Sequence, residues 1–251
     1  MYPDVPTGSG RHPIPFVALS ASDLAASTAF YGKLFGWRTH EVTPEITGAA
    51  TPTGPNVSLR ANTPVGFPGM VPFIGVADVS AMLDRIVAGG GTIERAPWSV
   101  PMAGTLARFA DPSGTIYGLT SGVPGTLALV PVPFGSNPKP PAGTICSIEM
   151  YSTDHTVTAR FFNDLFEWGT LETMPQYLGF DPGGGISGVF QSHTPSLPAV
   201  AYVYVPDAAA TLKEIEAAGG TRVGDPIAAP GMGTFGYFID PSGTHMGLIG
   251  P

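Results

Sequence analysis

Cysteine is nearly absent from this sequence, since Cys146 is the only one among 251 residues. A single cysteine cannot form a disulfide within the chain, and it cannot supply the ligands of a cysteine-built zinc site. Charged residues make up only 12% of the chain, and 11 Lys and Arg residues are outnumbered by 19 Asp and Glu residues. Because nucleic acids and anionic membranes are bound by concentrated positive charge, we expect neither as a partner.

Long apolar runs are also absent, and no segment approaches the length of a membrane span. The first 15 residues are rich in proline and glycine and lack the apolar stretch of a signal peptide. Together with the scarcity of cysteine, this predicts a cytoplasmic protein.

Glycine, proline and apolar residues are abundant instead. The chain has 34 Gly and 28 Pro residues, and 43% of its residues are hydrophobic. This composition favours many short strands joined by turns around a real core, rather than a helical bundle.

Two pairs of matching segments divide the chain into similar halves. FYGKLFGW at 30–37 matches FFNDLFEW at 161–168, and DPSGTIYGL at 111–119 matches DPSGTHMGL at 240–248. The intervals around these segments are kept as well, which chance similarity would not do. The sequence therefore indicates an internal duplication.

We expect a first domain over 12–122, a proline-rich linker over 123–143 and a second domain over 144–250. Each domain divides again into two modules, at about 14–61, 69–121, 144–190 and 198–250. Every module begins with a short apolar strand, which is 14–20 in the first, continues with a helix and ends in further strands. The first helix is predicted over 24–35 with Ser22 or Asp23 as its cap, the second has Asp78 or Ser80 as its cap, and the fourth is predicted over 208–217. The predicted fold class is α+β with mainly antiparallel sheet.

In combination, these motifs resemble the vicinal-oxygen-chelate superfamily, which contains glyoxalases, bleomycin-resistance proteins and extradiol dioxygenases. The four-module length and the Phe-Gly-Trp ending are similar to the two-domain glyoxalase-like subgroup often labelled hydroxylases. The resemblance implies paired βαβββ modules, with each pair curling its sheet around a cleft.

The resemblance also implies where metal ligands would lie, namely on the first strand of each module and on the closing strand of the second module of each pair. These positions correspond to Phe16, Val71 and Gly118 in the first half and to Ser147, Val200 and Gly247 in the second. None of these residues is a credible ligand. We therefore expect no metal at the usual site and no cofactor.

Strand alternation predicts which other side chains face each cleft. The first cleft is expected to be apolar apart from Arg108, which could hold an anion or form a surface salt bridge. The second is expected to be polar and aromatic. Its expected substrate-binding residues are Ser147, Tyr151, Tyr202, Tyr204 and Tyr237.

Glu149 and His245 are the expected catalytic residues in the second cleft. If they face each other, the carboxylate would orient the imidazole as an acid–base pair. A structural salt bridge would explain Glu149 equally, and a surface position would explain His245. The other four histidines, His12, His40, His155 and His193, are expected to be solvated.

Three functions remain open. The first is a metal-independent isomerase, cyclase or lyase acting on a hydrophobic, oxygenated metabolite by acid–base chemistry, as in secondary metabolism. The second is a binding protein that sequesters a drug or metabolite, as bleomycin-resistance proteins do. The third is a metal-dependent dioxygenase or glyoxalase with relocated ligands. The expected partner is a hydrophobic or aromatic small molecule, and the protein could be a monomer or a homodimer.

Overall fold

The computed structural model describes residues 5–63, 67, 69–101, 103–122, 130, 138–193 and 199–251. Over these residues, one strand, one helix and three further strands follow each other four times along the chain. The α+β prediction is therefore confirmed. Most of the expected linker, 123–129 and 131–137, lies outside the described residues.

The strands of the first half form one eight-stranded sheet in the order β2-β3-β4-β1-β5-β8-β7-β6. Most neighbours are antiparallel, but β1 pairs parallel with β4, and β5 pairs parallel with β8. The elements are β1 (Phe16–Ser20), α1 (Leu24–Phe35), β2 (Arg38–Thr43), β3 (Ile46–Ala50), β4 (Asn56–Arg60), β5 (Met70–Gly75), α2 (Val79–Ala88), β6 (Thr92–Val100), β7 (Gly104–Ala110) and β8 (Ile116–Thr120).

The second half repeats this topology in the order β10-β11-β12-β9-β13-β16-β15-β14. Its elements are β9 (Ile145–Tyr151), α3 (His155–Phe166), β10 (Gly169–Met174), β11 (Tyr177–Asp181), β12 (Gly188–Gln191), β13 (Ala199–Tyr204), α4 (Ala208–Ala217), β14 (Thr221–Ala229), β15 (Gly233–Ile239) and β16 (His245–Gly250).

An aspartate caps the N-terminus of every helix. The side chains of Asp23, Asp78, Asp154 and Asp207 each accept a hydrogen bond from a main-chain amide of the first helical turn. These bonds satisfy amides that have no partner within the helix, which is why each helix begins where it does.

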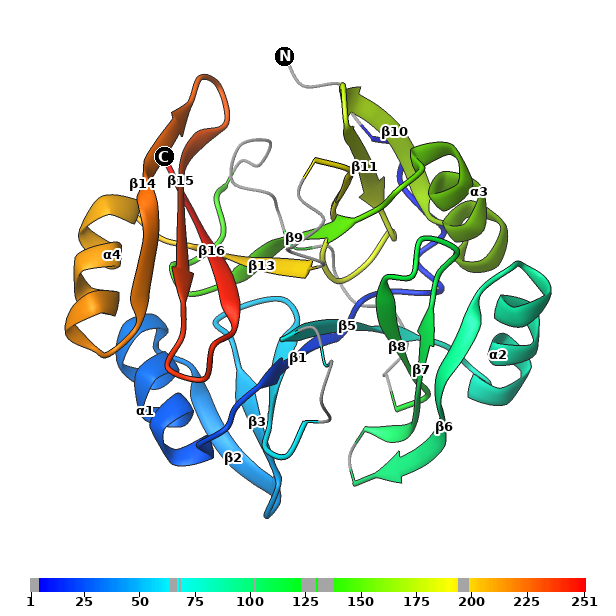
Figure 1. The fold of residues 1–251 in the computed structure, drawn as a ribbon, viewed down its shortest axis with the longest axis horizontal. Helices are drawn as coiled ribbons and strands as arrows, with labels where there is room; N and C mark the ends of the chain where they lie inside the picture. The colour runs from blue at the N-terminus through cyan, green and yellow to red at the C-terminus, as the bar shows by residue number, and fades with distance from the viewer. Residues whose placement is uncertain are drawn as a thin grey trace.

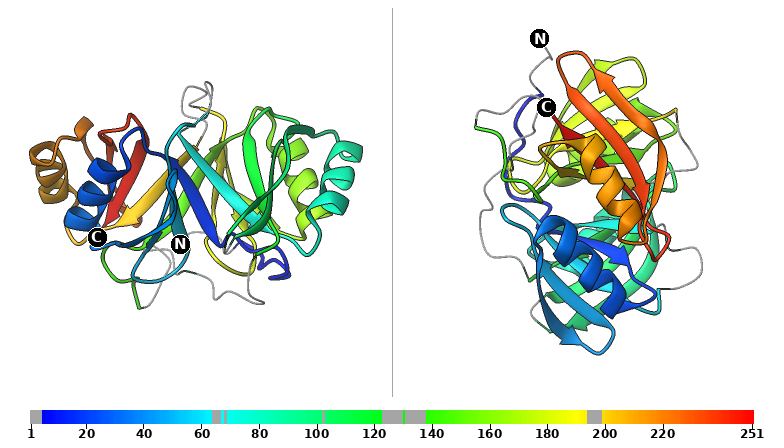
Figure 2. Two further views of the ribbon diagram at one scale, coloured as in Figure 1. Left: turned by 90° about the horizontal axis from the view of Figure 1, so that it is seen from below. Right: turned by 90° about the vertical axis from the view of Figure 1, so that its left-hand side faces the viewer.

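The helices pack across the two halves of the chain. Helix α1 lies beside α4, and α2 lies beside α3, at opposite ends of the molecule (Figures 1 and 2). One apolar core runs through both halves, and the ring of Phe109 on β7 lies 6.2 Å from that of Phe161 on α3. In the part of the chain that the structure describes, no helix is long and apolar enough to span a membrane.

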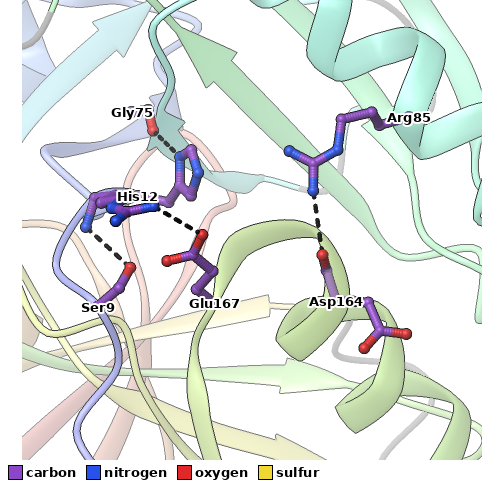
Figure 3. A network of polar contacts seen from close by, with 7 residues as sticks. Ser9, His12, Gly75, Arg85, Asp164 and Glu167 are labelled. Carbon is purple, nitrogen blue, oxygen red and sulfur yellow. Dashed lines mark hydrogen bonds and ion pairs between the residues drawn. The ribbon is translucent and has the colours of Figure 1, made fainter.

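The segment before β1 also joins the halves (Figure 3). His12 Nδ1 donates a hydrogen bond to the carbonyl oxygen of Gly75 at 3.0 Å, while Trp168 Nε1 donates to the carbonyl oxygen of His12. Arg11 forms an ion pair with Glu167 in the second half. The expectation that His12 is solvated is therefore wrong, because its ring is half-buried against Phe166.

The two Asp-Pro-Ser-Gly turns differ in one buried contact. Tyr31 on α1 donates a hydrogen bond to Asp240 Oδ2 at 2.8 Å. The corresponding position on α3 is Phe162, and Asp111 Oδ2 is buried without a hydrogen-bond partner among the described residues. The duplication has thus kept both carboxyl groups but only one of the two donors.

Candidate functional site

Each sheet has one face toward the helices and one face away from them, and we call the second its inner face. On β9, the side chains of Cys146, Ile148 and Met150 are fully buried toward the helices. The alternate residues Ser147 and Glu149 are half-exposed, as strand alternation requires of the opposite face.

The strand register gathers the predicted side chains on the inner face of the second sheet. Glu149 lies opposite Val200, and Tyr202 lies opposite both Ser147 and Gly247 in the neighbouring strands. The second inner face is defined by Ser147, Glu149, Tyr151, Val189, Gln191, Val200, Tyr202, Tyr204, Phe235, Tyr237, His245 and Gly247.

A series of hydrogen bonds joins three of these residues. Tyr202 Oη donates to Glu149 Oε2 at 2.6 Å, and the hydroxyl groups of Tyr202 and Tyr237 are 3.0 Å apart. Because one hydroxyl hydrogen cannot serve two bonds, Tyr237 donates to Tyr202. The order is therefore Tyr237 to Tyr202 to Glu149, from β15 through β13 to β9.

Burial sets the protonation behaviour of this series. Burial raises the pKa of the Glu149 carboxyl, while the Tyr202 hydrogen bond and the nearby His193 charge lower it less. The pKa of Tyr202 lies well above its ordinary value, first through burial and then through the Glu149 charge. Tyr202 consequently remains a hydrogen-bond donor, and Glu149 is the group that can exchange a proton.

The geometry does not form the predicted acid–base pair. His245 opens β16 on the inner face and is half-buried. Among the described residues, no hydrogen bond or ion pair joins it to Glu149. The imidazole that influences Glu149 is instead His193, which hydrogen-bonds Tyr177 Oη at 3.2 Å.

The other predicted side chains are placed as follows. Ser147 and Tyr151 are half-exposed on the second inner face, and Tyr204 is 9% exposed beside them. Arg108 lies on the first sheet and is therefore not brought together with Glu149. It forms an ion pair with Glu94, as one of the two predicted alternatives required. The Arg108 side chain is only 6% exposed, however, so this ion pair does not lie on the surface as predicted.

Sequence reasoning missed four residues near this face: Val189, Gln191, His193 and Phe235. Val189 lies opposite Glu149, and Phe235 packs edge-on against Tyr202 at 5.9 Å. Apart from Tyr237 on β15 and Arg108 on β7, the predicted residues came only from the strands that carry ligands in the metal-binding members. Extending strand alternation to β12 and β15 would have found three of the four.

At the closing-strand position of each half, where the metal-binding members carry a glutamate ligand, an aromatic ring fills the space of a side chain. A Cβ atom at Gly247 would overlap the ring of Tyr202, and one at Gly118 would overlap the ring of Phe73. A glutamate at either position would therefore need its neighbouring ring to move. Within the described residues, no group of three or more His, Cys, Asp or Glu side chains is placed to hold a metal ion. The donor set does not fit a metal at the usual site.

Replacing Gly247 by alanine tests whether the Tyr202 ring occupies the space of a side chain at this position. Because Gly247 has an ordinary backbone conformation, we expect a loss of about 1–3 kcal/mol of unfolding free energy from overlap with Tyr202 alone. The loss should disappear when Tyr202 is already alanine, as measured by a double-mutant cycle in urea. Gly32→Ala is the control, since its Cβ would lie 3.6 Å from the nearest atom, in ordinary contact. Equal costs with and without the Tyr202 ring would show that the ring is not the obstacle.

Comparison with known proteins agrees with this architecture. Residues 14–116 match the model of the Glyoxalase/Bleomycin resistance protein/Dioxygenase superfamily. The protein CFP32 of Mycobacterium tuberculosis, provisionally named a glyoxylase, is 29% identical over 254 residues and covers 94% of each chain. The anthracycline biosynthesis protein DauV of a Streptomyces species is 28% identical over 141 residues, which is 45% of this chain and 51% of that protein.

Two solved structures share the fold. The Mn(II)-bound glyoxalase of Novosphingobium aromaticivorans has a TM-score of 0.65 and 17% identity, covering 95% of this chain and 81% of that one. The 2,3-dioxygenase LapB of a Pseudomonas species has a TM-score of 0.66 and 13% identity, covering 98% and 93%. The repeated βαβββ modules of the chain thus have the fold of these glyoxalase and dioxygenase structures, and residues 14–116 match the model of the glyoxalase, bleomycin resistance protein and dioxygenase superfamily.

Proposed function

We propose that the chain is a metal-independent enzyme that moves protons on a hydrophobic, oxygenated small molecule at the second inner face. The observation that carries the proposal is the hydrogen-bonded series Tyr237–Tyr202–Glu149. A half-buried carboxylate with a raised pKa, held by one hydroxyl donor, is equipped as a general base.

Glu149 has one carboxylate oxygen engaged by Tyr202, and the other, Oε1, is the oxygen that receives the proton. The substrate loses that proton from a carbon next to a carbonyl group, and the C–H electron pair moves to form an enolate. The hydroxyl of Tyr151 lies on the same face and would donate to the enolate oxygen. Glu149 then returns the proton to another atom of the substrate, so that the reaction is an isomerisation and consumes no oxidant or reductant.

The substrate class follows from the aromatic surroundings of Glu149. Tyr151, Tyr202, Tyr204 and Phe235 supply ring surfaces for a flat molecule, and the hydroxyl groups of Tyr151 and Tyr204 serve its oxygens. The similarity of part of the chain to an anthracycline biosynthesis protein points the same way. We propose a polycyclic aromatic ketone as the substrate.

Deuterium exchange tests this function directly. The protein, treated with a chelator, is incubated in D₂O with an anthracycline aglycone, and the aglycone is analysed by mass spectrometry. We expect deuterium at a carbon next to a carbonyl group, at a rate proportional to protein concentration. Absence of exchange above the protein-free rate, for this aglycone and for simpler tetracyclic ketones, would contradict the proposal.

A sequestering protein is the second candidate, because the same aromatic face could hold a flat ligand without reacting. The net charge of −8 would favour a cationic ligand. Saturable binding of an aminosugar-bearing anthracycline, recovered unchanged and without deuterium, would favour sequestration over catalysis.

Metal content separates both candidates from a relocated metal site. After incubation with iron, manganese, nickel or zinc and desalting, we expect well below one metal ion per chain, because Glu149 and His245 alone make a weak site. The check is elemental analysis of the purified protein. One metal ion per chain that is lost in Glu149→Ala or His245→Ala would overturn metal independence.

A further inference from the structure

The first inner face gathers three arginines in a chain that has only 11 Lys and Arg residues. Arg60 ends β4, Arg95 lies on β6 and Arg108 on β7. Each guanidinium lies against an aromatic ring, with Arg60 Cζ 5.4 Å from the centre of the Phe73 ring and Arg95 Cζ 3.9 Å from that of Trp98. The three charges therefore surround an aromatic surface on one sheet.

Two of these charges, those of Arg60 and Arg95, have no carboxylate partner among the described residues. Glu94 forms an ion pair with Arg108, at 2.6 Å between Oε2 and Nε. The hydrogen bond that Arg60 makes is from Nε to Ser58 Oγ, and no ion pair of Arg60 or Arg95 occurs within the described ranges. Beyond those ranges the sequence holds a single carboxylate side chain, Asp4.

Arg95 is exposed, whereas Arg60 is half-buried. An unbalanced, half-buried guanidinium such as that of Arg60 is costly, because burial weakens its hydration and like charges repel it. Consistent with this, the pKa of Arg60 is lowered to about 10 by burial and by the charges of Arg108 and Arg95. An anion between these arginines would relieve both effects.

The side chains beneath the arginines are apolar; most are buried, whereas Phe16, Trp98 and Ile116 are partly exposed. The rings of Phe16 and Phe73 stack with centres 4.6 Å apart and an interplanar angle of 15°. They belong to an apolar cluster that includes Ala18, Val71, Val100, Leu106, Ile116 and Trp98. A ligand that satisfies both the charge and this surface has a flat apolar body and one anionic group.

We propose that the first inner face binds an aromatic carboxylate, whose carboxylate is held by Arg60 and Arg95 and whose ring lies on the aromatic surface below them. This site is independent of the chemistry proposed at Glu149. The second inner face lacks it, because the residue that corresponds to Arg60 in strand register is Gln191, and the one that corresponds to Arg108 is Tyr237.

Calorimetric titration with three probes tests the site: 2-naphthoate, its neutral analogue 2-naphthamide and inorganic phosphate. We expect 2-naphthoate to bind at one site per chain, about tenfold tighter than the amide, because only the carboxylate forms charge-assisted hydrogen bonds. Phosphate should bind more weakly than 2-naphthoate, since it leaves the aromatic surface uncovered.

Arg60→Gln is the decisive variant, because it introduces the residue that the other repeat carries in the same register. It should weaken 2-naphthoate by about tenfold and leave the amide unchanged. Arg38→Gln removes the same charge from an exposed position of β2 and should change neither.

Several results would overturn the proposal. These are no saturable 2-naphthoate binding, 2-naphthoate binding that survives Arg60→Gln, and equal loss in Arg38→Gln. Phosphate binding that depends on Arg60 and is as tight as that of 2-naphthoate would reduce the site to one for inorganic anions. The deuterium exchange assigned to Glu149 is measured separately, so failure of either proposal leaves the other intact.

Discussion

Replacement of Glu149 by glutamine is expected to lower the rate of deuterium exchange by about 10²- to 10⁴-fold, the usual contribution of a positioned general base. Glutamine keeps the size of the side chain and can still accept the hydrogen bond from Tyr202. It cannot take a proton from carbon. The rate is measured by mass spectrometry at saturating aglycone, and binding is measured in parallel by quenching of the aglycone fluorescence. Binding should be nearly unchanged while exchange is lost.

The pH dependence of the wild-type rate provides a second measure of the same group. Because burial raises the pKa of Glu149, the carboxylate form becomes available only as the pH rises through this raised value. The exchange rate should rise with it. Tyr202→Phe removes a donor that lowers the pKa of Glu149. The rise of the exchange rate with pH should therefore occur at higher pH in this variant.

Tyr204→Phe is the matched control. It removes a tyrosine hydroxyl from the same strand that makes no hydrogen bond to Glu149 among the described residues, so it should not move the pH profile. Exchange that persists in Glu149→Gln, or a profile that shifts equally in both tyrosine variants, would remove Glu149 from the role of base.

The fold could be predicted from the sequence because the patterns that specify its helices and strands are local and recur in each module. Helices 24–35 and 208–217 were predicted with the bounds that the structure has. The first cap was predicted at Ser22 or Asp23 and the second at Asp78 or Ser80, because a polar side chain before an apolar periodic run satisfies free amides. The structure has Asp23 and Asp78 in these positions. Strand ends were less accurate, and the first strand begins at Phe16 rather than Ile14, because strand ends depend on partners elsewhere in the chain.

The site was only partly accessible. Alternation along β9 and β13 correctly placed Glu149 and Tyr202 on one face, because a strand has a fixed period. Whether Glu149 meets Tyr202 or His245 depends on side-chain reach across several strands, which no local pattern specifies. The grouping of Arg60 and Arg95 with Arg108 on the first inner face was not predicted, for the same reason. Arg60 and Arg108 are far apart in sequence and meet only through β1, β5 and β8.

Replacement of Asp111 by asparagine is expected to stabilise the protein, most strongly above neutral pH. Burial raises the pKa of Asp111 to about 7, although the amides of Thr115 and Ser113 donate to Oδ1 and favour the charged form. Within the part of the chain that the structure describes, the Oδ2 atom has no donor, unlike that of Asp240, which accepts from Tyr31. Asparagine keeps the acceptor at Oδ1 and removes the buried charge.

The direction of the pH effect follows from proton linkage. Since the pKa of Asp111 is raised on folding, the native protein binds the proton more tightly than the unfolded chain does. The stability associated with this group is present below about pH 3.8 and is lost as the pH rises through about 7. The rise of about three pKa units corresponds to at most about 4 kcal/mol.

The difference in unfolding free energy between Asp111→Asn and the wild type should therefore grow from pH 5 to pH 8 and then level off, by up to about 1.4 kcal/mol per pH unit. Urea unfolding at each pH measures it. Asp240→Asn is the matched control and should gain less, because Tyr31 already donates to that carboxylate. A constant difference across this range, or an equal gain in both variants, would show that the missing donor does not set the cost of the buried Asp111 charge.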